Sequence, residues 1–127
     1  MSALLLDAGA LIAVDRDDRA MMARLRVARS SDLALRTTGI IVAEAWRHPS
    51  GRQANLGRLL KAVDVRPVDE ALGRQAGVLL GKSAASDAPD ATLVAVAATG
   101  DRIVTADPGD IRRLVSASGR AVHVVPC

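Results

Sequence analysis

The sequence predicts a three-layer α/β/α domain, in which helices cover both faces of a mainly parallel sheet. Short apolar segments alternate with segments of helical periodicity along the whole chain, a pattern typical of parallel α/β folds. The hydrophobic fraction is 50%, yet Trp46 is the only aromatic residue. The core must therefore consist of small aliphatic side chains, which suit helices lying closely on a parallel sheet. At 127 residues, the chain is expected to form a single domain over residues 1–127.

The first half of the chain is predicted to contain two strands and four helices. The opening run 3–6 is short and apolar, as expected of a buried strand, and apolar residues at helical spacing indicate the second helix. Thr37 or Thr38 can cap the third helix, which Pro49 helps to end. The predicted strands lie at 3–6 and 33–35, and the predicted helices at 8–14, 18–28, 39–47 and 52–62.

The second half is predicted to add three strands and three helices. Alternating valines indicate a short strand at 63–68, and Asp69 can cap the helix that follows it. The segment Ser86–Pro89 is typical of a loop and helix start. A helix at 90–99, a strand at 102–105, a short helix at 109–117 and a last strand at 121–125 complete the predicted fold.

The composition favours an anionic partner and a reducing compartment. The net charge is +3, the sequence pI is about 10.0, and Lys61 and Lys82 are the only lysines. A GC-rich genome can produce this arginine bias, but arginine also suits bidentate contact with phosphate or carboxylate. Cys127 is the only cysteine, so no internal disulfide can form, which fits the cytoplasm. The N-terminal sequence does not resemble a signal peptide, and no apolar run approaches the ~20 residues of a membrane helix.

Four acids stand out because they interrupt or adjoin apolar segments: Asp7, Glu44, Asp90 and Asp107. Asp7 follows the first strand, Asp107 closely follows the strand at 102–105, and Asp90 opens the helix leading into that strand. Ligands of open α/β sheets gather beyond the C-terminal ends of the strands, so these three acids can converge on one edge. An unpaired buried carboxylate costs several kcal/mol. The chain therefore either pairs these acids with arginines or uses them to hold a cation.

Clustered carboxylates favour a hard divalent cation. Two unit charges about 4 Å apart repel by ~4 kcal/mol at an effective dielectric constant of about 20, so such a cluster keeps protons or recruits a cation. All-oxygen sites prefer Mg²⁺ or Mn²⁺ to zinc, and the only histidines, His48 and His123, do not support a zinc site. A metal held by carboxylates on one side leaves positions for water and phosphate oxygens on the other.

Each acid also has a purely structural interpretation. Asp7 can cap the helix that follows it, Asp90 can complement the dipole of its own helix, and Asp107 can serve as a turn residue. Glu44 can pair with Arg47, because residues three apart on a helix are neighbours. One shared cause explains all four positions more simply than four separate ones.

Four segments form an ordered set of motifs: Leu6–Ala13, Val42–Arg47, Asp87–Ala95 and Ile103–Asp107. Their order and spacing resemble those of PIN-domain ribonucleases of the VapC toxin type over nearly the whole length of the chain. The ordered set is fairly specific in a chain of this size.

The resemblance implies a PIN-like five-stranded parallel sheet and RNA cleavage that depends on Mg²⁺ or Mn²⁺. It implies that Asp7, Glu44 and Asp90 are the main metal ligands and Asp107 the fourth acid, with Thr105 forming a hydrogen bond within the acidic site. Family members act as toxins, are held inactive by a cognate antitoxin whose tail covers the acids, and usually form dimers. We therefore expect an RNA substrate, an antitoxin partner and a homodimer.

Two further acids lie near these motifs. Asp87 is one helical turn before Asp90 and can line the same pocket, although a cap or loop role is an equal alternative. Asp110 is a weaker candidate, and we expect it to cap the short helix at 109–117.

The chain departs from common RNA-binding patterns because it lacks tyrosine and phenylalanine. Trp46 is expected to lie in the core or in an interface, so recognition of single-stranded RNA would depend on shape, backbone groups and arginines. The arginines considered for contact with the RNA backbone are Arg16, Arg19, Arg24, Arg47 and Arg52.

The resulting hypothesis is that metal-activated water attacks a phosphodiester in line and leaves a 5′-phosphate and a 3′-hydroxyl. Two alternatives remain: a PIN-like module that only binds RNA or protein, and an aspartate-based phosphotransfer domain. A receiver domain would need a lysine after a late strand, and none follows Lys82. A haloacid-dehalogenase-type phosphatase would need Asp-x-Asp after the first strand, where this chain has Asp7-Ala8-Gly9.

Overall fold

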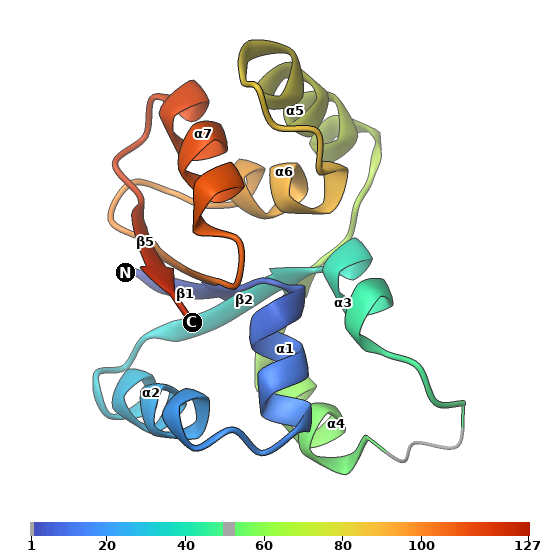
Figure 1. The fold of residues 1–127 in the computed structure, drawn as a ribbon, viewed down its shortest axis with the longest axis vertical. Coiled ribbons are helices and arrows are strands. Elements are labelled where there is room, and N and C mark those ends of the chain that lie inside the picture. Colours follow the sequence, from blue (N-terminus) through green and yellow to red (C-terminus); the bar gives the residue numbers. More distant parts are fainter. Residues whose placement is uncertain (1, 50–52) are drawn as a thin grey trace.

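A computed structural model describes residues 2–49 and 53–127 and contains one five-stranded sheet with helices on both faces (Figure 1). The sheet order is β3-β2-β1-β4-β5, and every neighbouring pair of strands is parallel. The predicted fold class, a three-layer α/β/α domain with a five-stranded parallel sheet, is confirmed. The strands are β1 (Ala3–Leu6), β2 (Ala34–Thr38), β3 (Val63–Arg66), β4 (Arg102–Thr105) and β5 (His123–Pro126).

The helices divide between the two faces of the sheet. In Figure 1, α5, α6 and α7 lie above the sheet, α1, α2 and α4 lie below it, and α3 follows the end of β2. Their bounds are α1 (Ala8–Asp15), α2 (Arg19–Ser30), α3 (Gly39–Ala45), α4 (Ala54–Leu60), α5 (Glu70–Lys82), α6 (Ala88–Ala95) and α7 (Pro108–Ser118).

Each face of the sheet has its own apolar core. Strand β1 is fully buried, and its side chains alternate between the faces because successive strand residues point in opposite directions. Leu5 packs with Leu93 under α5–α7, whereas Leu4 and Leu6 pack with Leu11 under α1–α4. Burial on both faces explains why β1 is a continuous apolar run rather than an alternating one.

Aspartates begin several of the helices. The side chains of Asp18, Asp69 and Asp87 accept hydrogen bonds from backbone N–H groups in the first turns of α2, α5 and α6. Gly119 adopts a left-handed conformation with φ +70° and ends α7. Among the described helices, none has the length and apolar character needed to cross a bilayer.

The structure differs from the predicted elements at several of their ends. Helix α6 begins two residues earlier than expected because Asp87 caps it. It ends at Ala95, before the expected residue 99. Thr38 occupies the N-cap position of α3, as one of the two expected residues, but its side chain makes no cap hydrogen bond. The Thr37 hydroxyl donates to the carbonyl of Leu6 at 2.7 Å, and the Thr38 hydroxyl pairs with Thr92 at 2.9 Å. Strand β2 continues to Thr38, whereas the predicted strand ended at residue 35. The expected helix start at residue 52 lies outside the described residues.

Candidate metal centre

The acids gather at the C-terminal edge of the sheet because β1 and β4 are parallel neighbours that end there together. Asp7 directly follows β1, and Asp107 follows β4 after a single intervening residue. Asp90 lies in the first turn of α6, and Glu44 lies near the end of α3. Figure 1 shows the beginnings of α1 and α7 close together at this edge.

Asp7 is buried, and hydrogen bonds fix both of its carboxylate oxygens. Oδ1 accepts from the backbone N–H of Ala10 at 2.8 Å, so Asp7 does cap α1. Oδ2 accepts from the Thr105 hydroxyl at 2.7 Å and from the backbone N–H of Ala106 at 2.9 Å. The Thr105 hydroxyl in turn accepts from the backbone N–H of Asp107 at 2.9 Å. Thr105 thus links the segment after β1 to the segment after β4.

Gly9 allows α1 to begin this close to the β4–α7 connection. A Cβ atom at position 9 would lie 2.5 Å from the Cβ of Ala106 and 3.4 Å from Oδ1 of Asp7. Any side chain there would force the two segments apart. The Asp7-Ala8-Gly9 sequence therefore combines a fixed carboxylate with the close approach that brings Asp107 to it.

Asp90 is the least compensated acid of the group. Only 6% of its surface is exposed, and no hydrogen-bond donor to its carboxylate exists among the described residues. Burial first, and then the negative charges of Asp87, Asp7, Asp107 and Glu44, together raise the pKa of Asp90 from its ordinary 3.8 to about 7. These four acids therefore lie close enough to Asp90 to act on the charge of its carboxylate.

Asp107 and Asp110 share a cluster with Asp90. One carboxylate oxygen from each of the three lies within 4.8 Å of the others. The expectation that Asp110 caps the short helix is wrong: Asp107 occupies the N-cap position of α7, and Asp110 lies in the first turn, where it pairs with Arg113. Asp107 itself makes no side-chain cap hydrogen bond.

Glu44 faces the same group of acids. Burial raises the pKa of Glu44 above its ordinary value, Asp87 and Asp7 add to the increase, and Arg47 opposes it. The local ion pair between Glu44 and Arg47 does not form. Instead the Arg47 guanidinium donates to the carbonyls of Ala43 at 2.9 Å and Trp46 at 2.8 Å.

Asp87 has two roles in the structure. Its Oδ1 accepts from the backbone N–H of Asp90 at 3.0 Å and caps α6. Its charge is also the largest electrostatic contribution to the raised pKa of both Asp90 and Glu44. The cap and pocket interpretations of Asp87 are therefore compatible.

Basic residues do not neutralise these acids in the part of the chain that the structure describes. Asp110 is the only one of them in a salt bridge. Of the arginines considered for RNA contact, Arg24 donates to the carbonyl of Pro126 at 3.2 Å, Arg16 and Arg19 are exposed, and Arg52 lies outside the described residues. An oxygen-rich, uncompensated cluster of this kind can accept a hard divalent cation.

Sequence reasoning missed two groups. Asp101 is a third buried acid besides Asp7 and Asp90, but it lies at the N-terminal edge of the sheet and accepts backbone hydrogen bonds there. Its position directly before a strand is the sequence feature from which its location at this edge could have been predicted. The Cys127 thiol lies near the acidic site: its pKa is raised by burial first and by the charge of Asp7 second. Only the register of β5 against β4 brings it there.

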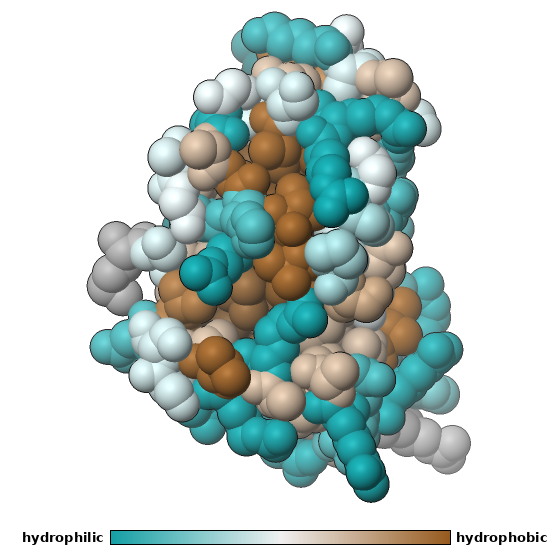
Figure 2. Space-filling model, turned by 60° about the vertical axis from the view of Figure 1, so that its left-hand side comes forward, coloured by the Kyte–Doolittle hydropathy of each residue, from teal (hydrophilic) through white to brown (hydrophobic). Residues whose placement is uncertain are grey.

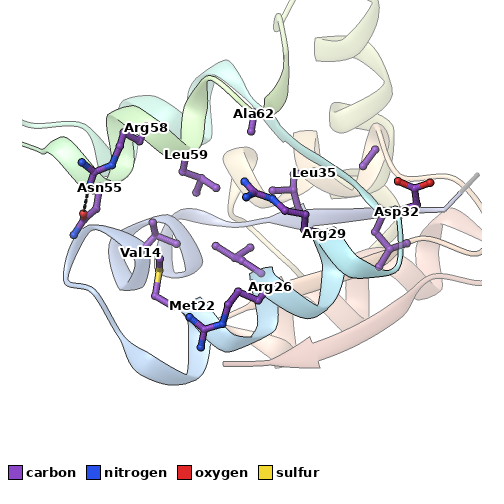
Figure 3. A pocket seen from close by; sticks show the side chains of 13 residues that line it. Val14, Met22, Arg26, Arg29, Asp32, Leu35, Asn55, Arg58, Leu59 and Ala62 are labelled. Carbon is purple, nitrogen blue, oxygen red and sulfur yellow. Dashed lines mark hydrogen bonds between the residues drawn. The ribbon is translucent and has the colours of Figure 1, made fainter.

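A separate groove lies below the sheet, between α2, α4 and β2 (Figure 3). Its volume is about 630 Å³, and Val14, Leu35 and Leu59 contribute to an apolar floor. Three arginines, 26, 29 and 58, also line it. More broadly, Figure 2 shows a band of hydrophobic residues bordered by hydrophilic ones on one face of the molecule. Exposed apolar patches of this kind often mark interaction surfaces.

Comparison with known proteins identifies the fold. No family model matches the sequence, and no curated protein matches it at the sequence level. A chain from the crystal structure of VapBC2 from Rickettsia felis, bound to a DNA fragment from their promoter, matches with a TM-score of 0.69. The match covers 96% of this chain and 98% of that chain at 11% sequence identity. At this identity the likeness establishes a shared fold.

Proposed function

We propose that this protein is a divalent-metal-dependent endoribonuclease of the PIN-domain type, and that it acts as the toxin of a toxin–antitoxin pair. The observation that carries the proposal is the grouping of Asp7, Glu44, Asp90 and Asp107 at the C-terminal edge of the sheet without matching cations among the described residues. The fold shared with a chain of the VapBC2 complex supports the same assignment.

The donor set fits Mg²⁺ or Mn²⁺. The group offers carboxylate oxygens from Asp7, Glu44, Asp90 and Asp107, with Asp110 close to the last two. Hard cations prefer such ligands, and binding one would relieve the repulsion that raises the pKa of Asp90. When bound, the ion would supply Lewis acidity toward a phosphate oxygen and lower the pKa of a water molecule.

The residues of the chain would orient the reacting groups. Asp7 is held by three donors, so the direction of its carboxylate is set before any ligand arrives. Thr105 acts as a positioning residue, since its hydroxyl contacts both Asp7 and the backbone of Asp107. Asp90 would carry a proton about half the time near pH 7 in the metal-free protein and release it when the cation binds.

An antitoxin and a second copy of the chain are the partners we propose. The groove of Figure 3 suits an amphipathic segment with acidic residues, because its floor is apolar and arginines line it. A second hollow of about 440 Å³ lies where α3, α5 and α6 meet, and the exposed Ile40 and Val68 line it. We assign this second surface to the homodimer.

The main alternative is a PIN-like module that binds without cleaving. Such a module would hold its acids with hydrogen-bond donors, whereas the Asp90 and Glu44 carboxylates accept none from the described residues. The test is cleavage of RNA in Mn²⁺ or Mg²⁺, with and without EDTA, by the wild type and by Asp90→Asn. Glu70→Gln is the matched control, because Glu70 is an exposed acid on α5 paired with Arg74. Cleavage that persists in EDTA or in Asp90→Asn would reject the proposal.

A further inference from the structure

A basic groove lies next to the acidic cluster, on the α5–α7 side of the sheet. It has a volume of about 450 Å³ and runs between the end of α5 and one side of α7. Its side chains are cationic, hydroxyl-bearing or small, without a large apolar residue. They are Lys82, Ser83, Ala84, Arg112, Arg113, Ser116 and Ala117.

Two segments connect this groove to the acids. Along α7, Arg113 lines the groove and pairs with Asp110, whose carboxylate belongs to the cluster with Asp90 and Asp107. Along the other side, Lys82 ends α5, and the short connection after it leads to Asp87 at the start of α6. The groove therefore adjoins the candidate metal centre through the Arg113–Asp110 pair.

The cations of the groove are available for a ligand. Lys82 and Arg112 are exposed, and neither forms a salt bridge with any described residue. We propose that this groove binds the phosphodiester backbone of the RNA substrate on one side of the scissile bond, with Lys82 and Arg112 contacting phosphates. This inference rests on the proposed function, because it uses the acidic cluster as the point of cleavage.

An RNA backbone fits the groove better than an acidic protein segment does. Protein partners are anchored by apolar or aromatic side chains in pockets, and the α5–α7 groove has no apolar floor, unlike the groove of Figure 3. Phosphate oxygens need only cations and hydroxyl or N–H donors. The alanines at 84 and 117 leave space for a sugar–phosphate chain to approach closely.

Contacts in this groove are expected to be independent of base sequence. The only aromatic residue, Trp46, packs against α4, where its ring atoms lie within 3.9 Å of the position that a Cβ of Gly57 would occupy. Base stacking on an aromatic ring is therefore not provided at the groove, and charge supplies the affinity.

The experiment compares two double variants that remove the same charges. The test variant is Lys82→Gln with Arg112→Gln. The matched control is Lys61→Gln with Arg102→Gln, which also removes one exposed lysine and one exposed arginine, at the end of α4 and at the N-terminal edge of the sheet. Arg113 is left intact because its loss would disturb Asp110.

Binding of a fluorescent single-stranded RNA is measured in EDTA, which prevents cleavage, from 50 to 200 mM salt (about the range in which charge contacts dominate). Cleavage is then measured in Mn²⁺.

For the test variant we expect the negative slope of log affinity against log salt to become about 1.4 units less steep, because two phosphate contacts are lost. In the cleavage assay, KM should rise while kcat is retained. The control should match the wild type. Equal slopes in the test and control variants, with normal cleavage by the wild type, would overturn the groove assignment and leave the nuclease proposal standing. A reduced slope without any metal-dependent cleavage by the wild type would support RNA binding in the groove and reject the nuclease. Retained RNA affinity together with charge-dependent binding of polyglutamate would assign the groove to an acidic protein and overturn the inference.

Discussion

The two edges of the sheet provide opposite surroundings for a buried aspartate, with hydrogen-bond donors at one edge and like charges at the other. At the N-terminal edge, Asp101 is 1% exposed, and its two oxygens accept from the backbone N–H groups of Ala3 and Ala98, each at 2.8 Å. The Arg36 guanidinium lies 3.8 Å from the same carboxylate. At the C-terminal edge, Asp90 is 6% exposed, accepts no hydrogen bond from the described residues and is surrounded by other acids.

This difference separates a structural carboxylate from a candidate ligand. A buried acid with matched donors joins chain segments and stabilises the fold. A buried acid among like charges destabilises the fold unless a proton or a cation relieves the repulsion. Burial alone therefore does not identify a functional acid in this protein. The acids around it do, because Asp7, although held by three donors, shares the C-terminal edge with Asp90, whereas Asp101 does not.

The largest effect is expected for Asp90→Asn. The substitution keeps the shape of the side chain but removes the charge that a divalent ion needs, so Mn²⁺-dependent RNA cleavage should fall by more than about 100-fold. The melting temperature of the metal-free protein at pH 8 should be unchanged or higher, because repulsion is relieved. Turnover and thermal unfolding measured on the same preparation test both parts. A variant that is inactive because it is unfolded would contradict the comparison of the two edges.

Asp101→Ala is expected to do the reverse. It leaves the backbone N–H groups of Ala3 and Ala98 without their acceptor, so the free energy of unfolding should fall by about 2–4 kcal/mol. Urea denaturation measures this loss. Under conditions where the variant is folded, the affinity for Mn²⁺ should equal that of the wild type, because Asp101 lies at the opposite edge from the acids. A selective loss of metal affinity would show that the two edges are coupled.

Thr105→Val tests the positioning of Asp7. Valine has nearly the same shape as threonine but cannot donate to Oδ2 of Asp7 or accept from the backbone of Asp107. We expect the affinity for Mn²⁺ to fall by about 10-fold, since partners that orient ligands typically contribute 10–100-fold. Isothermal titration calorimetry provides the measurement, and Thr105→Ser, which restores the hydroxyl, should recover most of the affinity. If serine does not recover it, packing and not hydrogen bonding explains the role of Thr105.

Much of the fold was predictable because local signals and burial agreed. The apolar run of β1, the cap at Asp69, and the alternation of strands and helices all depend on neighbouring residues. The grouping of Asp7 with Asp107 followed from the rule that parallel strands end at the same edge.

What could not be predicted depends on register and on side-chain direction. Asp110 joins Asp90 only because α7 begins at Pro108, so that its first turn lies over the acids. Asp101 resembles Asp107 in sequence, since each adjoins the same apolar strand, and only the positions of Ala3 and Ala98 reveal its donors. The failure of the Glu44–Arg47 pair depends on a rotamer that no sequence pattern specifies.

The effect that compares the edges most directly is the pH dependence of stability without metal. The pKa of Asp90 is about 7 in the folded protein against an ordinary value of 3.8, so the folded state binds a proton that the unfolded state releases. Stability from this group is therefore fully present below pH 3.8 and declines as the pH rises toward 7.

Subtracting the Asp90→Asn profile isolates the contribution of Asp90. Other groups titrate equally in both proteins, for example Asp64, whose pKa is lowered chiefly by its hydrogen bond with Arg66. Chemical denaturation from pH 5 to pH 8 should show the wild type losing stability relative to the variant, and saturating Mn²⁺ should reverse that loss. A flat difference profile would mean that Asp90, like Asp101, has a compensating partner.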